Sequence, residues 1–223
     1  MDDISEENKQ EEIWLTDTDI FTQIWLSPRK VFKFINDHRY DSLTTLLVIF
    51  GGITSALNRA SDKHMGDSMS LFAVLIISVI VGAVFGWLSY YIYAALMSWT
   101  GKWMKGKGNT EALFRMISYS LIPSLIILPL ILTRILLIGN KEFQNNVDLY
   151  SEGTLVAVLC FITYFLEFMF GLWTLFIIVV GISEVQQFSI GKAIVNLILP
   201  GAMILAIIAP IAAIMYLVTH FLS

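Results

Sequence analysis

Long apolar segments alternate with short polar ones along most of this chain. The apolar segments cover residues 42–58, 71–99, 113–134, 154–182 and 193–219. About 20 helical residues cross the hydrocarbon core of a bilayer, and soluble domains rarely carry such runs. Because a backbone in lipid must satisfy its own hydrogen bonds, we expect each segment to be an α-helix. The pattern therefore predicts an all-α integral membrane protein with five transmembrane helices.

The chain before these segments has a different pattern. Residues 1–16 are acidic and poor in apolar side chains, which predicts a disordered arm. In residues 17–40 apolar positions recur at helical spacing, and Ser27-Pro28 is a typical helix start. We expect two amphipathic helices there, lying either on the cytoplasmic leaflet or packed under the bundle by the same face. Residues 41–223 then form the five-helix domain.

Charge predicts the orientation and excludes several classes of function. Ten of the 14 Lys and Arg residues fall on the side of the N-terminus, which predicts a cytoplasmic N-terminus and an external C-terminus. Only 14% of residues are charged, against roughly 25% in soluble domains, so we expect lipid to surround most of the chain. The acidic arm gives no surface for nucleic acid.

Prolines interrupt the third and fifth apolar segments. Each removes a backbone donor and is expected to bend or break its helix. These predicted kinks lie at Pro123, Pro129, Pro200 and Pro210.

The sequence offers no convincing site for a cofactor or for catalysis. Gly101–Gly108 resembles a phosphate-binding loop, but it lacks the Ser or Thr that binds magnesium, and no strand precedes it. His38, His64 and His220 are scattered, with no second ligand at helical spacing. We therefore expect no enzyme activity, no metal, no nucleotide and no other cofactor.

Glu167 is the only carboxylate inside an apolar segment. A charge at lipid depth is costly and normally faces a cavity or a partner. One interpretation is a proton or cation site, or an ion pair with Arg134 or Arg115. The other is a protonated glutamate that hydrogen-bonds to neighbouring hydroxyl groups, for which the chain offers Ser118, Ser120 and Tyr164.

Two loops on the predicted cytoplasmic side show a faint repeat. In residues 112–123 and 189–200 a cation stands eight positions before a proline. A duplicated two-helix unit would place these loops side by side. We predict a polar cluster there, which locks the helix ends or presents a docking surface. Its members are Glu111, Arg115, Glu184, Gln187 and Lys192.

Three stretches resemble the Yip family of five-span membrane proteins. They are S-P-R-K-V-F-K-F-I at Ser27–Ile35, G-N-T-E-A-L-F-R-M-I-S-Y-S-L-I-P at Gly108–Pro123 and G-I-S-E-V-Q-Q-F-S-I-G-K-A at Gly181–Ala193. The resemblance covers about residues 25–220 and implies a cytoplasmic N-terminus. Eukaryotic members are associated with Rab GTPases, vesicle budding and organelle shape, whereas bacterial members have no settled role. The short acidic arm departs from the eukaryotic type, which favours a bacterial inner-membrane protein without Rab binding.

Two hypotheses for function follow. The first is a non-enzymatic scaffold that organises membrane and binds a protein partner at its cytoplasmic face. Separately, small-residue stripes such as Gly82/Gly86 would serve either packing within the chain or a homo-oligomer. The second is a small ion or solute transporter or channel that uses Glu167. A transporter needs a water path to Glu167, whereas a scaffold leaves this carboxylate dry.

Overall fold

The computed structural model describes residues 14–221, in which helices are the only regular elements. The helices are α1 (Asp17–Gln23), α2 (Pro28–Asp37), α3 (Thr44–Asp62), α4 (Leu71–Trp103), α5 (Thr110–Ser120), α6 (Ser124–Ile138), α7 (Thr154–Gln186) and α8 (Ile190–Phe221). Short 3-10 helices cover Met65–Asp67, Gly139–Phe143 and Leu149–Glu152. The prediction of an all-α protein is confirmed. Most of the predicted acidic arm lies at residues 1–13, outside the described residues.

Within residues 14–221, four helical segments are long and apolar enough to cross a membrane. They are Leu71–Trp103, Ser124–Phe143, Thr154–Gln186 and Ile190–Thr219. Each has 20 residues or more, which matches a hydrocarbon core of about 30 Å. The chain is thus an integral, multi-pass membrane protein. The remaining predicted span, α3, is more polar because Asn58, Arg59, Ser61 and Asp62 lie near its end, so a fifth span stays a prediction.

The third predicted span, residues 113–134, is not one helix. Helix α5 ends at Ser120 and α6 begins at Ser124, with a turn between them. Pro123 has no N–H and cannot donate to the Tyr119 carbonyl four residues earlier, which instead accepts the Ile122 N–H at 3.2 Å. A single span at 113–134 is therefore replaced by two helices. By contrast, α6 continues through Pro129, and α8 continues through its two prolines.

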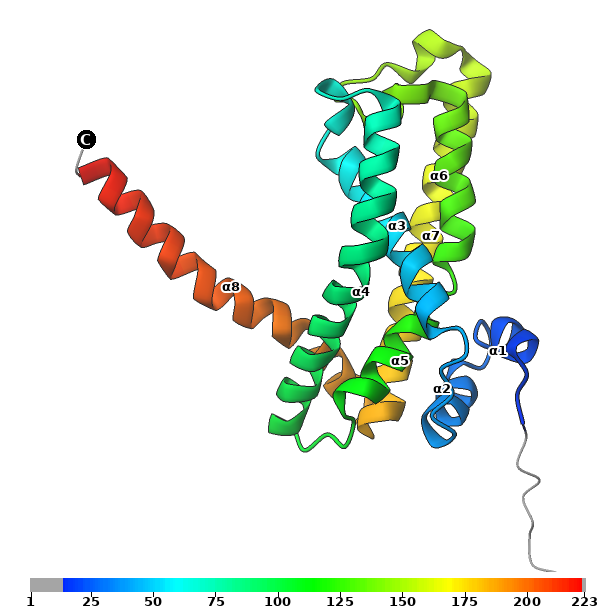
Figure 1. Cartoon of the computed structure of the whole chain (residues 1–223), viewed down its shortest axis with the longest axis vertical. Coiled ribbons are helices and arrows are strands. Elements are labelled where there is room, and N and C mark those ends of the chain that lie inside the picture. Colours follow the sequence, from blue (N-terminus) through cyan, green and yellow to red (C-terminus); the bar gives the residue numbers. More distant parts are fainter. Residues whose placement is uncertain (1–13, 222–223) are drawn as a thin grey trace, which may run out of the picture.

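Helices α3, α4, α6 and α7 form the body of the bundle (Figure 1). Helices α3 and α4 approach each other closely, because a Cβ added to Gly52 would lie 2.2 Å from the Gly82 oxygen. Only the first turns of α8 pack on α4 and α7, and Figure 1 shows the rest of α8 running away from the bundle. Large apolar side chains such as Leu205, Ile207 and Met215 are exposed there, which in a membrane places them against lipid.

The bundle has two ends, each with its own hydrophobic core. The end that carries α1, α2, the loop 104–109 and the turn 187–189 is called the N-terminal end. Its core includes Ile20, Ile24, Val31, Phe32, Leu113, Met116 and Ile182. The opposite end, called the far end, carries the loops 63–70 and 139–153. Its core consists of Leu57, Ala60, Val74, Ile127, Ile131, Ile135 and Phe143.

Helices α1 and α2 pack against the bundle. Val31, Phe32 and Ile35 are at most 1% exposed, and α2 contacts both α5 and α7. The sequence left two placements open for the apolar face of α2, and in the structure this face packs on the bundle. Trp14 and Leu26 remain exposed at 64% and 89%, so this layer also offers apolar groups to its surroundings.

Candidate functional site

A buried arginine joins two carboxylates at the far end of the bundle. Arg134, near the end of α6, donates from Nε to Glu142 Oε1 at 2.9 Å and from Nη2 to Glu167 Oε2 at 2.7 Å. The Arg134 and Glu142 side chains are 2% and 1% exposed, and that of Glu167 is 17% exposed. Glu167 comes from α7, and Glu142 from the 3-10 helix that follows α6.

Two further side chains complete this arrangement. The Tyr164 hydroxyl donates to Glu142 Oε2 at 2.9 Å, and its ring lies 4.0 Å from the guanidinium carbon of Arg134. From α3, Asn58 Nδ2 donates to Glu167 Oε1 at 2.6 Å. Every carboxylate oxygen of Glu142 and Glu167 therefore has a partner within the protein. We call these five residues the ion cluster.

The ion cluster ties three parts of the chain together at the far end. Desolvating charged groups is costly, and the cost is offset only when the remaining lone pairs and N–H groups are satisfied; here all four carboxylate oxygens are paired, whereas Arg134 Nη1 is buried without a partner within the described residues. Here α3, α6 and α7 each contribute a member, so the cluster fixes their mutual positions. To bind a cation, Glu167 would first have to leave Arg134 or Asn58. As built, the cluster is suited to bracing the helices.

A cavity of about 250 Å³ opens at the far end beside the ion cluster. Its lining includes Glu142 and Tyr164 together with residues of the 139–153 loop, but not Glu167. The cavity thus approaches one carboxylate of the cluster and stops short of the other.

A second polar cluster lies at the N-terminal end, and its side chains are neutral. Gln186 and Asn196 are 0% exposed. Gln186 Oε1 accepts the Gly108 N–H at 2.9 Å, and its Nε2 donates to the Met97 oxygen and to Asn196 Oδ1, each at 3.3 Å. Asn196 Nδ2 donates to Thr100 Oγ1 at 2.9 Å and to the Met97 oxygen at 3.1 Å. We call Gln186, Asn196 and Thr100, with these backbone groups, the amide cluster.

The amide cluster joins the ends of three helices to a loop. Thr100 and Met97 belong to α4, Gln186 ends α7, and Asn196 lies in the first turns of α8. The loop 104–109 is fastened to the same point, because the Lys107 N–H also donates to the backbone oxygen of Gln186 at 3.2 Å. Burial of neutral amides costs little once they are hydrogen-bonded, so this cluster locks the N-terminal end without charge.

The cytoplasmic cluster expected from the sequence has a looser geometry. Its five residues are all described, and no side-chain hydrogen bond or ion pair joins any two of them, although the Gln187 backbone N–H donates to the Glu184 backbone oxygen at 3.3 Å. They are Glu111, Arg115, Glu184, Gln187 and Lys192. Glu184 instead faces Arg29 of α2 at 3.9 Å, and the Lys192 ammonium lies 6.0 Å from the Phe188 ring. Arg115 Nε is buried without a partner within the described part of the chain.

The sequence singled out Glu167 and offered two arginines as its ion-pair partner. The structure places one of them, Arg134, beside it. It missed Glu142, which lies outside the apolar segments and carried no signal of burial. It also missed the buried amides and chose Gln187, which is exposed, instead of its neighbour Gln186. The sequence did carry one signal for the buried amides, because Asn196 is a polar residue surrounded by apolar ones.

The comparison with known families agrees with this architecture. The family profile described as the Yip1 domain matches residues 22–213, which include all the residues of both clusters. Among curated proteins none matches the chain significantly, and the same holds for solved structures. The matched region begins in α1 and extends far into α8. Because it covers most of the sequence, the chain belongs to the Yip family of Yip1-domain membrane proteins.

Proposed function

We propose that this protein is a non-enzymatic membrane scaffold of the Yip type, which binds a protein partner at its N-terminal end. The observation that carries the proposal is the loop 104–109, which is hydrogen-bonded to the amide cluster while its cations are exposed. These are Lys105 and Lys107, and Lys102 in the last turn of α4 is exposed beside them. A surface whose backbone is already fixed loses less entropy on binding, so it suits the docking of a partner.

Several contacts hold this loop in place. The Gly108 N–H donates to Gln186, and the Ser98 hydroxyl donates to the Gly108 oxygen at 3.3 Å. Gly106 lies so close to Gln186 that an added Cβ would stand 2.3 Å from its Oε1. The second half of the loop is therefore packed against buried groups. Exposed Glu111 and Gln187 border it, so the docking face carries both signs of charge and an amide.

We also propose that the N-terminal end lies on the cytoplasmic side of a bacterial inner membrane. It is supported by the excess of Lys and Arg at that end. A fluorescent reporter that matures only in the cytoplasm is expected to stay dark when fused after Ser223 and to fluoresce when fused before Met1. Fluorescence from both fusions would contradict the five-span count, and fluorescence from the C-terminal fusion alone would contradict the orientation.

Photo-crosslinking in cells tests the docking face. A crosslinking amino acid is placed at Lys105 or at Glu111, and, as a matched control, at exposed Asn145 of the far end. We expect discrete adducts from the first two positions and none from the control. The mass of the adduct distinguishes a second copy of this chain from another protein. Gln186→Ala, which releases the loop, is expected to weaken the adduct at Lys105; adducts of equal yield at both ends would contradict a docking face.

A transporter or channel is the second candidate, and the far-end cavity beside Glu142 is the observation that favours it. Against it, Glu167 is occupied by Arg134 and Asn58, and the cavity does not reach it. Transport through Glu167 would require this carboxylate to be reached by water and released from its partners. Ion flux through reconstituted protein therefore separates the two candidates.

A further inference from the structure

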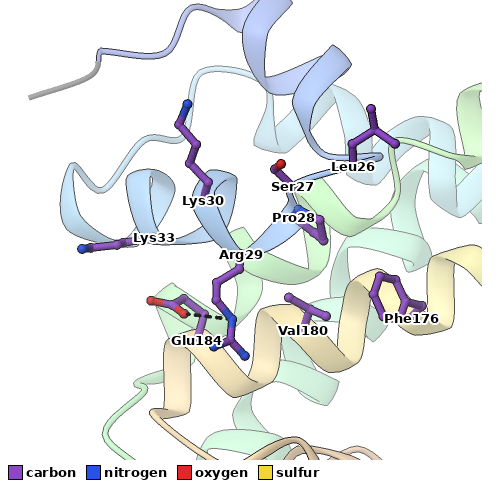
Figure 2. A pocket seen from close by; sticks show the side chains of 9 residues that line it. All are labelled: Leu26, Ser27, Pro28, Arg29, Lys30, Lys33, Phe176, Val180 and Glu184. Atoms are coloured by element: carbon purple, nitrogen blue, oxygen red, sulfur yellow. Dashed lines mark ion pairs between the residues drawn. The ribbon is translucent and has the colours of Figure 1, made fainter.

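A groove of about 610 Å³ lies between the first turns of α2 and the last turns of α7 (Figure 2). Neither the ion cluster nor the amide cluster contributes to it. It is lined by Leu26, Ser27, Pro28, Arg29, Lys30, Lys33, Phe176, Val180 and Glu184. Charged groups occupy one part of this lining and apolar groups the other.

The charged part carries three cations and one carboxylate. Arg29 reaches toward Glu184, whereas Lys30 and Lys33 project from α2 away from α7 (Figure 2). The Arg29–Glu184 distance is 3.9 Å, and the two side chains are 62% and 26% exposed, so this pair is weak and easily exchanged. No ion pair holds Lys30 or Lys33 within residues 14–221. The rim therefore has an excess of positive charge.

The apolar part follows α7 away from that rim. Phe176 stands eight positions before Glu184, which corresponds to about 12 Å along the helix. Phe176 is 49% exposed and Leu26, on the other wall, is 89% exposed. Beyond Phe176, exposed Leu172 continues the same apolar surface toward the middle of the span. The groove thus runs from a cationic rim at the helix end to an apolar wall at lipid depth.

We propose that this groove binds one anionic phospholipid. Its phosphate replaces Glu184 beside Arg29, whose Nη2 also donates to Ser183 Oγ at 3.5 Å. Lys30 and Lys33 reach the phosphate by rotating from their present directions toward the groove, while an acyl chain lies along Phe176 and Val180. Cations beside an anionic leaflet attract headgroups, and the start of α2 adds the positive end of a helix dipole. The Ser27 hydroxyl makes no capping bond to α2 and is available to the phosphate. This proposal needs only the membrane location of the chain and does not depend on the scaffold role.

Native mass spectrometry of the full-length protein tests it. The protein in neutral detergent is titrated with phosphatidylglycerol or phosphatidylcholine of the same acyl chains, and bound lipids are counted. We expect a preference for phosphatidylglycerol of at least about tenfold, given three cations at the rim. The variant R29A/K30A/K33A should lose this preference. The matched control K102A/K105A/K107A removes the same charge from the same end of the bundle and should keep it.

A second pair of variants tests the apolar wall at constant charge. Phe176→Ala should weaken phosphatidylglycerol binding several-fold, because contact area with the chain is lost. Phe161→Ala removes a 70% exposed ring elsewhere on α7 and should have no effect. All four variants change exposed side chains, and unchanged thermal unfolding confirms that they fold.

Three results would overturn the proposal. Equal loss of preference in both triple variants indicates diffuse surface attraction without a site. Unchanged binding in R29A/K30A/K33A excludes the groove. Glycerol phosphate carries the phosphate but no acyl chain. If it displaces the lipid and Phe176→Ala has no effect, the groove is a site for free phosphate.

Discussion

The ion cluster and the amide cluster lie at opposite ends of the same bundle and differ in charge. The ion cluster places one arginine between two carboxylates, whereas the amide cluster contains only neutral groups. Both lie beside a hydrophobic core, where unpaired polar groups are costly. Removing one charged partner leaves a buried ion uncompensated, while removing one amide leaves only unpaired hydrogen-bonding groups. The comparison teaches that two buried polar clusters, one charged and one neutral, should respond differently when a member is removed.

The largest expected effect comes from Arg134→Met. This change leaves Glu142 and Glu167 buried without a cation and should lower the free energy of unfolding by about 3–5 kcal/mol. Unfolding by added SDS in mixed micelles, followed by circular dichroism, measures it. The triple variant R134M/E142Q/E167Q removes all the charges together and should recover most of the loss. If the triple variant is as unstable as Arg134→Met, charge is not what distinguishes this cluster.

An intermediate effect is expected from Gln186→Ala. The Gly108 N–H and Asn196 Oδ1 lose their Gln186 partner, which should cost about 1–3 kcal/mol in the same unfolding assay. Gln187→Ala makes the same chemical change at an exposed neighbouring position and should alter stability little. A loss larger than that of Arg134→Met would invert the comparison between the two clusters.

The smallest effect sharpens the role of burial. Lys141 and Glu152 also form an ion pair at the far end, but their side chains are 43% and 31% exposed. Lys141→Ala should cost at most about 1 kcal/mol, because solvent screens the pair. A cost near that of Arg134→Met would mean that the far end depends on all its ion pairs alike, and not on the buried one.

Apolar runs predicted the helices well because a membrane span must be both long and apolar. The break in the third segment was harder to place. Pro129, Pro200 and Pro210 stay inside helices, whereas the chain turns at Pro123. A proline always removes a donor, and packing around it decides whether the helix bends or ends.

The clusters were predictable only in part, for two physical reasons. Glu142 comes near Glu167 because Arg134 bridges the two carboxylates and Tyr164 of α7 donates to Glu142, and these tertiary contacts have no local pattern. Gln186 and Gln187 are the same residue type side by side. Only Gln186 points inward, because α7 ends there and Gln187 adopts a left-handed conformation with φ of 55°. Local composition thus locates a polar turn but not the residue that is buried.

Ion flux is the measurement that tests the central claim most directly, namely that the ion cluster braces the bundle and does not conduct. Purified wild-type protein and Glu167→Gln are reconstituted in liposomes, and proton and cation flux are followed with entrapped dyes. The account predicts flux no greater than that of protein-free liposomes for both proteins, with Glu167→Gln less stable than wild type. Flux through the wild type that Glu167→Gln abolishes would contradict the account and make Glu167 the centre of a transport site.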